Sequence, residues 1–275
     1  MEEKIVLSYF TFLLIFIGLP LAVVTILYRR KYQEGEENQK TMIKRILIAL
    51  TILIVVAITY TTPWDNFLVE NAIWYYENSK IIGILIGFVP IEEYAFFVFQ
   101  TLLIGLIFGW IQLQKTNKDN HYDLKQNLRL ISSLSFFIIW LVSFIIFINK
   151  IESLTYLNLI LLWGIPPIII QLIYGADILW LSRRDLISVI SVSTIYLAVV
   201  DAIAIGEGVW TININTSTGI LLAGMLPIEE FLFFLVTNIL ITFGLILMID
   251  SRSIDRFNGF YTRIKEILLR TRMER

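Results

Sequence analysis

Long apolar stretches alternate with short polar segments along almost the whole chain. Seven of these stretches approach or exceed the length of about 20 residues that an α-helix needs to cross a bilayer. They lie roughly at 5–28, 42–60, 81–113, 128–149, 155–180, 186–205 and 219–249. The third and seventh stretches are longer than one crossing requires, which predicts a tilt or a break within each. The pattern therefore predicts an all-α integral membrane protein with seven transmembrane helices.

Composition narrows the class of protein further. Hydrophobic residues make up 57% of the chain and charged residues 16%, whereas a soluble domain has about 45–50% and about 25%. These values argue against a soluble enzyme, a disordered chain and a nucleic-acid-binding protein. The chain has no cysteine and one histidine, His121, which excludes disulfides, thiolate sites and a centre built from several histidines. No metal site is predicted.

Basic residues are distributed unevenly between the predicted loops. Of the 22 lysines and arginines, all but Lys4, Lys80 and Lys150 follow the first, third, fifth or seventh stretch. The positive-inside rule then predicts a protein of the cell (cytoplasmic) membrane with its N-terminus outside and its C-terminus in the cytoplasm. Basic and apolar residues alternate in 251–275, which predicts an amphipathic helix on anionic lipid. The alternative is a frayed cytoplasmic end.

The chain contains an internal repeat. PIEEYAFFVFQT begins at Pro90, and PIEEFLFFLVTN begins 137 residues later. The tripeptide GLP at 18–20 recurs as GIP at 164–166, 146 residues later. Stretches 1–3 thus correspond to stretches 5–7 in the same direction, and the fourth connects them. The repeat predicts two parallel three-helix halves, with a functional site between them near the middle of the membrane.

This correspondence divides the chain into four parts. Residues 1–113 form the first repeat, 114–150 the connector with the fourth helix, 151–250 the second repeat and 251–275 the basic tail. Upstream of the repeated motifs, Asp65 and Trp74 recur as Asp201 and Trp210, each 136 residues later.

Each repeated motif carries two adjacent glutamates, Glu92 and Glu93 in the first and Glu229 and Glu230 in the second. Counted from the start of the third and seventh stretches, they would lie about 15–18 Å into the membrane, close to its centre. A carboxylate there costs about 2.5–3.5 kcal/mol. We therefore expect these side chains to face a site between the halves, with at least one kept neutral by burial and able to act as a general acid.

A structural role for the glutamates is the alternative. Pro90 and Pro227 remove a backbone donor, which within a helix leaves the carbonyls of Ile86 and Ala223 without their usual partner. A protonated glutamate could donate to such a carbonyl and hold the halves together. Adjacent residues point about 100° apart on a helix. One glutamate of each pair can be chemical and the other structural, and the sequence leaves open which.

Further candidates surround the glutamates. Asp65 and Asp201 end the second and sixth helices, where they either approach the glutamates or cap a helix. Gln100 and Thr237 follow Glu93 and Glu230 by seven residues on the same helix face. The candidate substrate-binding residues are Gln100, Thr237 and the aromatic residues Trp74, Tyr94, Phe97, Trp210, Phe231 and Phe234. Aromatic faces attract cations, although membrane packing and an interfacial belt account for many such residues.

The doubled Pro-Ile-Glu-Glu within seven predicted spans resembles the membrane-embedded lycopene cyclase domain. In that family the repeats occur as separate subunits, as one fused chain or fused to phytoene synthase. The resemblance covers about residues 1–250 and is to the fused two-repeat form. It implies acid-catalysed, non-redox cyclisation of the ψ end groups of lycopene to β-ionone, less often ε-ionone, rings in carotenoid biosynthesis, with no cofactor.

The resemblance also implies roles and partners. Glu93 and Glu230 are the first-choice acid and base, Glu92 and Glu229 the second choice, and Asp65 and Asp201 support them. The partners would be lycopene or a related acyclic carotenoid drawn from the bilayer, membrane lipid and other enzymes of the carotenoid pathway, but no nucleic acid. Two rival functions stay open, a proton-coupled small-molecule transporter and a non-catalytic carotenoid-binding membrane protein.

Overall fold

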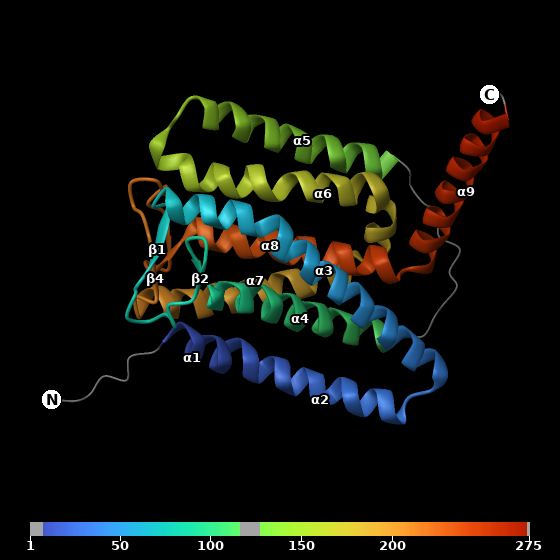
Figure 1. Cartoon of the computed structure of the whole chain (residues 1–275), viewed down its shortest axis with the longest axis horizontal. Coiled ribbons are helices and arrows are strands. Elements are labelled where there is room, and N and C mark those ends of the chain that lie inside the picture. Colours follow the sequence, from blue (N-terminus) through green and yellow to red (C-terminus); the bar gives the residue numbers. More distant parts are fainter. Residues whose placement is uncertain (1–7, 116–126, 274–275) are drawn as a thin grey trace.

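The computed structural model describes residues 8–115 and 127–273. Within these ranges, seven helical segments are long and apolar enough to cross a membrane, as the hydrophobic pattern predicts. Figure 1 shows them side by side as one bundle, and the chain is accordingly an integral membrane protein. Lys4 and the segment 116–126, which contains His121, lie outside the described residues.

The helices follow one another along the chain with short connections. The first crossing consists of α1 (Tyr9–Leu13), the π-helical turn η1 (Leu14–Gly18) and α2 (Leu19–Glu34). The other elements of the bundle are α3 (Glu37–Glu70), α4 (Ile91–Leu113), α5 (Asn127–Ile148), the 3-10 turn η2 (Glu152–Leu154), α6 (Thr155–Leu181), α7 (Arg183–Gly206) and α8 (Ile228–Ile249). The last helix, α9 (Ser251–Met273), leaves the bundle at an angle (Figure 1).

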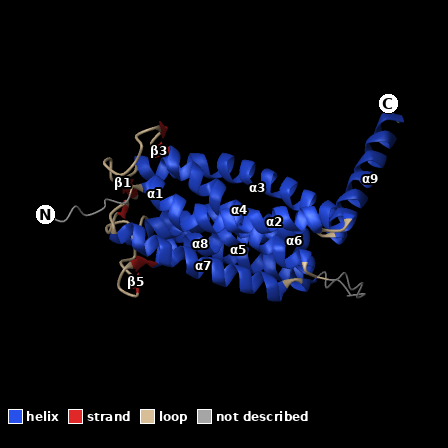
Figure 2. Ribbon diagram, turned by 90° about the horizontal axis from the view of Figure 1, so that it is seen from below, coloured by secondary structure: helices blue, strands red, loops and turns tan. Residues whose placement is uncertain are grey.

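Short strands, which the apolar pattern does not predict, gather at one end of the bundle (Figure 2). They are β1 (Trp74–Tyr76), β2 (Leu85–Ile86), β3 (Val89–Pro90), β4 (Trp210–Ile212), β5 (Leu221–Leu222) and β6 (Leu226–Pro227). Strands β2 with β3 and β5 with β6 form small hairpins directly before α4 and α8. Strand β1 pairs antiparallel with β4, so it ties the two halves of the chain together.

These hairpins are the breaks in the third and seventh apolar stretches. Residues 81–90 and 219–227 are strand and turn, and the helices begin only at Ile91 and Ile228. Gly87, with φ of 68°, makes one of the turns, a conformation that glycine adopts without steric cost. Proline directly before a helix loses no hydrogen bond that the helix needs. The prediction that Pro90 and Pro227 leave unpartnered carbonyls inside a helix is therefore wrong.

The predicted depth of the glutamates is wrong for the same reason. Glu92 and Glu93 lie in the first turn of α4, and Glu229 and Glu230 in the first turn of α8. The four carboxyl groups therefore lie near the strand end of the bundle instead of at its middle. Hydropathy alone does not separate an apolar hairpin from an apolar helical turn, because both consist of the same residue types.

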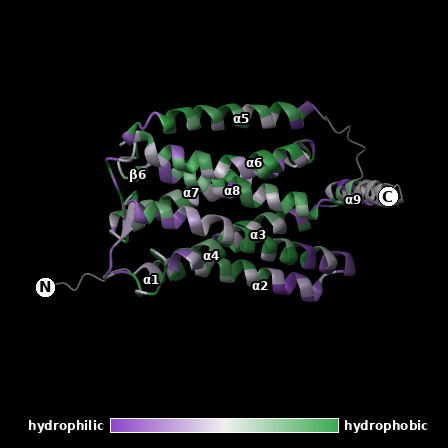
Figure 3. Cartoon of the chain, turned by 45° about the horizontal axis from the view of Figure 1, so that its top comes forward, coloured by the Kyte–Doolittle hydropathy of each residue, from purple (hydrophilic) through white to green (hydrophobic). Residues whose placement is uncertain are grey.

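The two helices that carry the glutamates occupy the centre of the bundle. In α4 and α8 the most apolar segment is 61% buried, compared with 11% in α5 and 17% in the first crossing. Figure 1 shows α5 along one edge against α6, and α1 and α2 along the other. Hydrophobic residues cover the lengths of the helices and hydrophilic ones gather toward their ends (Figure 3). Isoleucine and leucine side chains such as Leu130 and Ile138 are exposed on α5, as a lipid-facing surface requires.

We predict that Gly105→Ala destabilises the contact between α3 and α4. A β-carbon at this position would overlap the side chain of Leu50, and such overpacking typically costs about 1–3 kcal/mol. Gly206→Ala is the matched control, since no atom lies within 4 Å of the added carbon. Thermal unfolding in detergent, followed by circular dichroism, should show a lower midpoint for Gly105→Ala only. Equal midpoints for the two variants would contradict the packing described here.

Candidate active site

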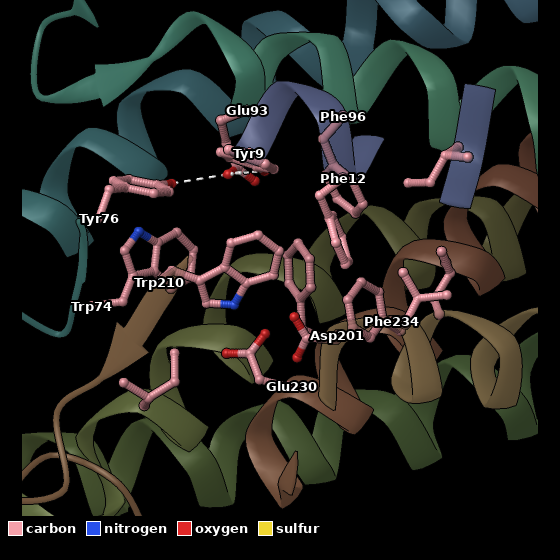
Figure 4. Close-up of a pocket in the computed structure, with 15 residues that line it drawn as sticks. Tyr9, Phe12, Trp74, Tyr76, Glu93, Phe96, Asp201, Trp210, Glu230 and Phe234 are labelled. Atoms are coloured by element: carbon pink, nitrogen blue, oxygen red, sulfur yellow. Dashed lines mark hydrogen bonds between the residues drawn. The ribbon is translucent and has the colours of Figure 1, made fainter. Parts of the chain in front are cut away.

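An aromatic-lined cavity lies between the two halves, close to the strand end of the bundle (Figure 4). Its volume is about 40 Å³. Three acidic side chains, Glu93, Asp201 and Glu230, are part of its wall. The aromatic residues around them include Tyr9, Phe12, Trp74, Tyr76, Phe96, Trp210, Phe233 and Phe234. The cavity therefore combines carboxyl groups with a largely apolar wall, from α1, β1, α4, α7, β4 and α8.

Glu93 is held by two tyrosines from different elements. The hydroxyl of Tyr9, in α1, donates to Oε2 of Glu93 at 2.6 Å, and the hydroxyl of Tyr76, in β1, donates to the same oxygen at 2.9 Å. Burial and the charge of Glu93 raise the pKa of Tyr76 well above its usual value of 10.0. Its hydroxyl therefore stays protonated and serves as a donor to the glutamate.

Glu230 is held by one tyrosine. The hydroxyl of Tyr156, in the first turn of α6, donates to its Oε1 at 2.6 Å. Figure 4 shows Glu93 and Glu230 on opposite sides of the cavity, with Trp210 and Asp201 between them. The first crossing thus positions one glutamate, and α6 positions the other.

The neighbouring glutamates have a different task. Oε1 of Glu92 accepts the backbone N–H of Ile82 at 2.6 Å, and Oε1 of Glu229 accepts that of Thr218 at 2.6 Å. Both side chains are at most 1% exposed. They attach the segments that precede the two hairpins to the first turns of α4 and α8. The choice left open by the sequence is thereby narrowed, because Glu93 and Glu230 face the cavity while Glu92 and Glu229 hold backbone.

Asp65 and Asp201 are buried within α3 and α7, at 0% and 2% exposure. Among the described residues, no hydrogen-bond partner lies within reach of either carboxyl group. They do not cap their helices, which continue five residues further. Asp201 lines the cavity, and Asp65 lies close enough to Glu93 and Glu230 to interact with both electrostatically. Unpartnered buried carboxyl groups are costly, so their presence here is a feature of the site.

Gln100 and Thr237 contact each other. Nε2 of Gln100 donates to Oγ1 of Thr237 at 2.9 Å and to Oδ1 of Asn238 at 3.3 Å. Seven residues of helix span about 10.5 Å, so a shared helix face does not bring Gln100 to Glu93. The pair instead joins α4 to α8 below the cavity, beside a second, larger space.

That space is an apolar groove of about 290 Å³ between α3, α4, α6 and α8. Phe233 lines both the groove and the cavity. Its ring stacks with Trp64 and Trp163 at centroid separations of 5.9 and 6.0 Å, and the two tryptophans stack on each other at 4.5 Å. Tyr60 and Trp64 of α3 also donate to the carbonyls of Trp163 and Leu159 in α6, at 2.7 and 3.2 Å. These rings separate the two spaces.

The remaining aromatic candidates are distributed around both spaces. Trp74, Trp210 and Phe234 line the cavity, and Phe97 lines the groove with Gln100 and Thr237. Tyr94 donates to the carbonyl of Ile86 at 3.5 Å, and Phe231 is half-buried on α8. Neither is part of the wall of the cavity or of the groove.

Sequence reasoning missed the tyrosines that hold the glutamates. Tyr9 and Tyr156 lie 147 residues apart, near the starts of the first and fifth stretches. The GLP and GIP tripeptides that follow differ by only 146 residues, so a repeat alignment without a gap does not pair the tyrosines. The one extra residue falls in the π-helical turn 14–18, and π-turns accommodate such single insertions inside a helix.

Three relatives share most of their cyclase region with this chain. The lycopene beta-cyclase of Halobacterium salinarum is 31% identical over 240 residues, which cover 87% of this chain and 95% of the relative. The bifunctional lycopene cyclase/phytoene synthase of Aspergillus oryzae is 30% identical over 202 residues, which cover 72% of this chain and 34% of the relative. The same bifunctional protein of Gibberella fujikuroi is 33% identical over 223 residues, 79% of this chain and 38% of the relative.

The chain corresponds to nearly all of the haloarchaeal protein and to about a third of the fungal ones. No family model matches the chain, and no solved structure matches it. Identity of this level over so much of both chains shows common descent. The chain belongs to the lycopene cyclase family.

Proposed function

We propose that this protein cyclises the ψ end groups of lycopene to β-ionone rings, without a redox step and without a cofactor. The observation that carries the proposal is the pair of glutamates, Glu93 and Glu230, that face one aromatic-lined cavity from two sides. The printed names of the relatives give the substrate and the ring type. A proton donor and a proton acceptor in one apolar space are what a non-redox cyclisation requires.

The reaction balances with these groups alone. A neutral carboxyl group gives a proton to the terminal double bond of the end group and leaves a tertiary cation. The π electrons of the neighbouring double bond close the ring and move the positive charge to another ring carbon. A carboxylate then removes a proton from the adjacent carbon, whose electrons form the ring double bond. The proton gained and the proton lost cancel, so lycopene and its product have the same atoms.

The wall of the cavity suits the intermediate. Trp74, Trp210 and Phe234 present aromatic rings, whose faces attract positive charge. They also exclude water, which would otherwise add to the cation. A cavity of about 40 Å³ holds only a few water molecules. Binding of an end group therefore requires side chains of the wall to move.

The groove between α3 and α6 is the proposed path of the substrate from the bilayer. Its lining is mostly apolar, with Leu53, Ala57 and Ile170 among its residues. A polyene has no polar group that would need a partner there. Since Phe233 lines both spaces, rotation of the stacked rings around it would join the groove to the cavity.

The two-repeat organisation is part of the proposal. Supporting it are equivalent contacts in each half, such as Tyr9 with Glu93 and Tyr156 with Glu230. The hydroxyl of Tyr60 donates to the carbonyl of Trp163, and that of Tyr196 donates to the carbonyl of Phe16. We retain the division into 1–113, 114–150, 151–250 and 251–275, with the halves related by an axis along the membrane normal.

Orientation and partners complete the proposal. The strand end of the bundle, with the cavity, would face outward, and the end that bears α9 would face the cytoplasm, where basic residues concentrate. Helix α9 would rest on anionic lipid. Other enzymes of the carotenoid pathway are natural partners, because they would supply the hydrocarbon. A transporter or a non-catalytic carotenoid carrier is not favoured, because the relatives are named as cyclases.

We predict that Glu93→Gln and Glu230→Gln each abolish β-ring formation in a lycopene-accumulating bacterial host. An amide keeps the shape of the side chain but neither donates nor accepts the proton. Pigment chromatography measures the outcome, with the wild-type chain and Glu70→Gln, an exposed residue at the end of α3, as controls. Wild-type levels of β-carotene in both cavity variants would overturn the assignment of the site.

A second prediction tests the groove. Ala57→Phe fills space in its wall and should lower the rate of β-carotene formation at limiting lycopene without changing the amount of folded protein. Val55→Phe adds the same bulk to the same helix at a position that is 56% exposed and outside the groove, so it should leave the rate unchanged. Rates in lycopene-loaded liposomes provide the measurement. Equal rates for the two variants would place the substrate path elsewhere.

A further inference from the structure

The two halves of the cavity differ at one position that bears on the chemistry. Strands β1 and β4 pair so that Trp74 faces Ile212, Tyr75 faces Thr211 and Tyr76 faces Trp210. With an offset of 136 residues, Trp210 is the counterpart of Trp74 and Ile212 is the counterpart of Tyr76. The pseudo-two-fold axis thus passes through the Tyr75 and Thr211 pair, and it relates a tyrosine on one side to an isoleucine on the other.

The consequence is an unequal number of donors at the two glutamates. Glu93 accepts hydrogen bonds from Tyr9 and Tyr76, whereas Glu230 accepts one from Tyr156. Tyr9 and Tyr156 are counterparts, so the difference arises from position 76 alone. Ile212 lines the same cavity but has no hydroxyl to donate.

Hydrogen bonds donated to a carboxyl group favour its charged form. Two phenol hydroxyls in an apolar surrounding stabilise a carboxylate more than one does, and a bond to a charged acceptor is worth more than a neutral one. Of the two groups that share this cavity, Glu93 is the better stabilised as an anion. Two charged carboxylates in one apolar cavity repel each other, so a charge on Glu93 also favours the neutral form of Glu230.

We propose that the two glutamates have fixed and different roles, with Glu230 as the acid and Glu93 as the base, and that Tyr76 sets this division. The inference rests on the proposed cyclase function. Glu230 gives its proton to the terminal double bond, and Glu93 takes the proton that the ring releases. Both hydroxyls at Glu93 bind Oε2, and no described residue donates to its Oε1 or to Oε2 of Glu230. One free oxygen therefore remains on each side for the proton transfers.

The cycle closes when the proton returns from Glu93 to Glu230. Asp201 lies in the cavity wall with both oxygens unpartnered among the described residues, and Asp65 is buried close by in the same condition. These carboxyl groups, with water in the emptied cavity, can pass one proton from one glutamate to the other. After the transfer, Glu230 is neutral and Glu93 is charged, ready for the next end group.

The first test compares the two glutamate variants by what happens to lycopene instead of by β-ring formation. Glu230→Gln should leave lycopene untouched, because no cation forms. Glu93→Gln should still consume lycopene slowly, and the cation should end in hydrated carotenoids or in rings with a displaced double bond. Chromatography with mass spectrometry, using purified protein in lycopene-loaded liposomes, separates these products. The reverse pattern, or untouched lycopene in both variants, would overturn the division of roles.

The second test changes the number of hydroxyls. Tyr76→Phe removes one from Glu93 and should raise the share of displaced-bond and hydrated products, whereas Tyr75→Phe, at a side chain 51% exposed, should not. Ile212→Tyr adds a hydroxyl on the side of Glu230, and Ile212→Phe adds the same ring without it. We expect lycopene consumption to be roughly tenfold slower with Ile212→Tyr than with Ile212→Phe.

The outcomes separate the inference from the function on which it rests. If the wild-type chain, shown to be folded in the liposomes, leaves lycopene unchanged, the proposed function fails. If the wild type forms β-rings while Tyr76→Phe keeps the wild-type product ratio and the two Ile212 variants consume lycopene equally fast, the function stands and the division of roles fails. A merely structural role of Tyr76 would lower the yield without changing the product ratio.

Discussion

The bonds between tyrosine hydroxyls and buried glutamates are the interaction on which the architecture of the site depends. A carboxyl group in an apolar surrounding needs a partner, and the chain supplies it from the first helix of each half. Tyr9 brings the first crossing to α4, and Tyr156 brings α6 to α8. The same contacts that satisfy the carboxyl groups therefore position the walls of the cavity and join elements far apart in the sequence.

A second constraint keeps the site closed and oriented. Glu92 and Glu229 hold the backbone ahead of the two hairpins, and β1 pairs with β4 across the halves. These contacts form the roof over the cavity at the strand end of the bundle. Because Trp74 and Tyr76 belong to that roof, backbone pairing determines which side chains the glutamates meet. Duplication supplied two matching halves, and one unmatched tyrosine makes them chemically unequal.

Hydrophobic patterning predicted the crossings well but the position of the glutamates badly. The apolar runs at 81–113 and 219–249 contain hairpins as well as helices, so the depth counted from their starts was too large. Gln100 and Thr237 were expected beside the glutamates because they share a helix face. One helix face extends over more than ten ångströms, and the two residues found each other instead. Periodicity predicts direction around a helix and says nothing of distance along it.

The sequence by itself determined the class of protein, the seven crossings, the internal repeat and the four glutamates, because apolar length and repeated motifs are local properties of the chain. Only the tertiary structure decided which glutamate of each pair faces the cavity, and that Tyr9, Tyr76 and Tyr156 hold them. Those contacts depend on strand pairing and on a single inserted residue in a π-helical turn. Pairings between distant segments leave no periodic signal, since each is fixed by packing in three dimensions.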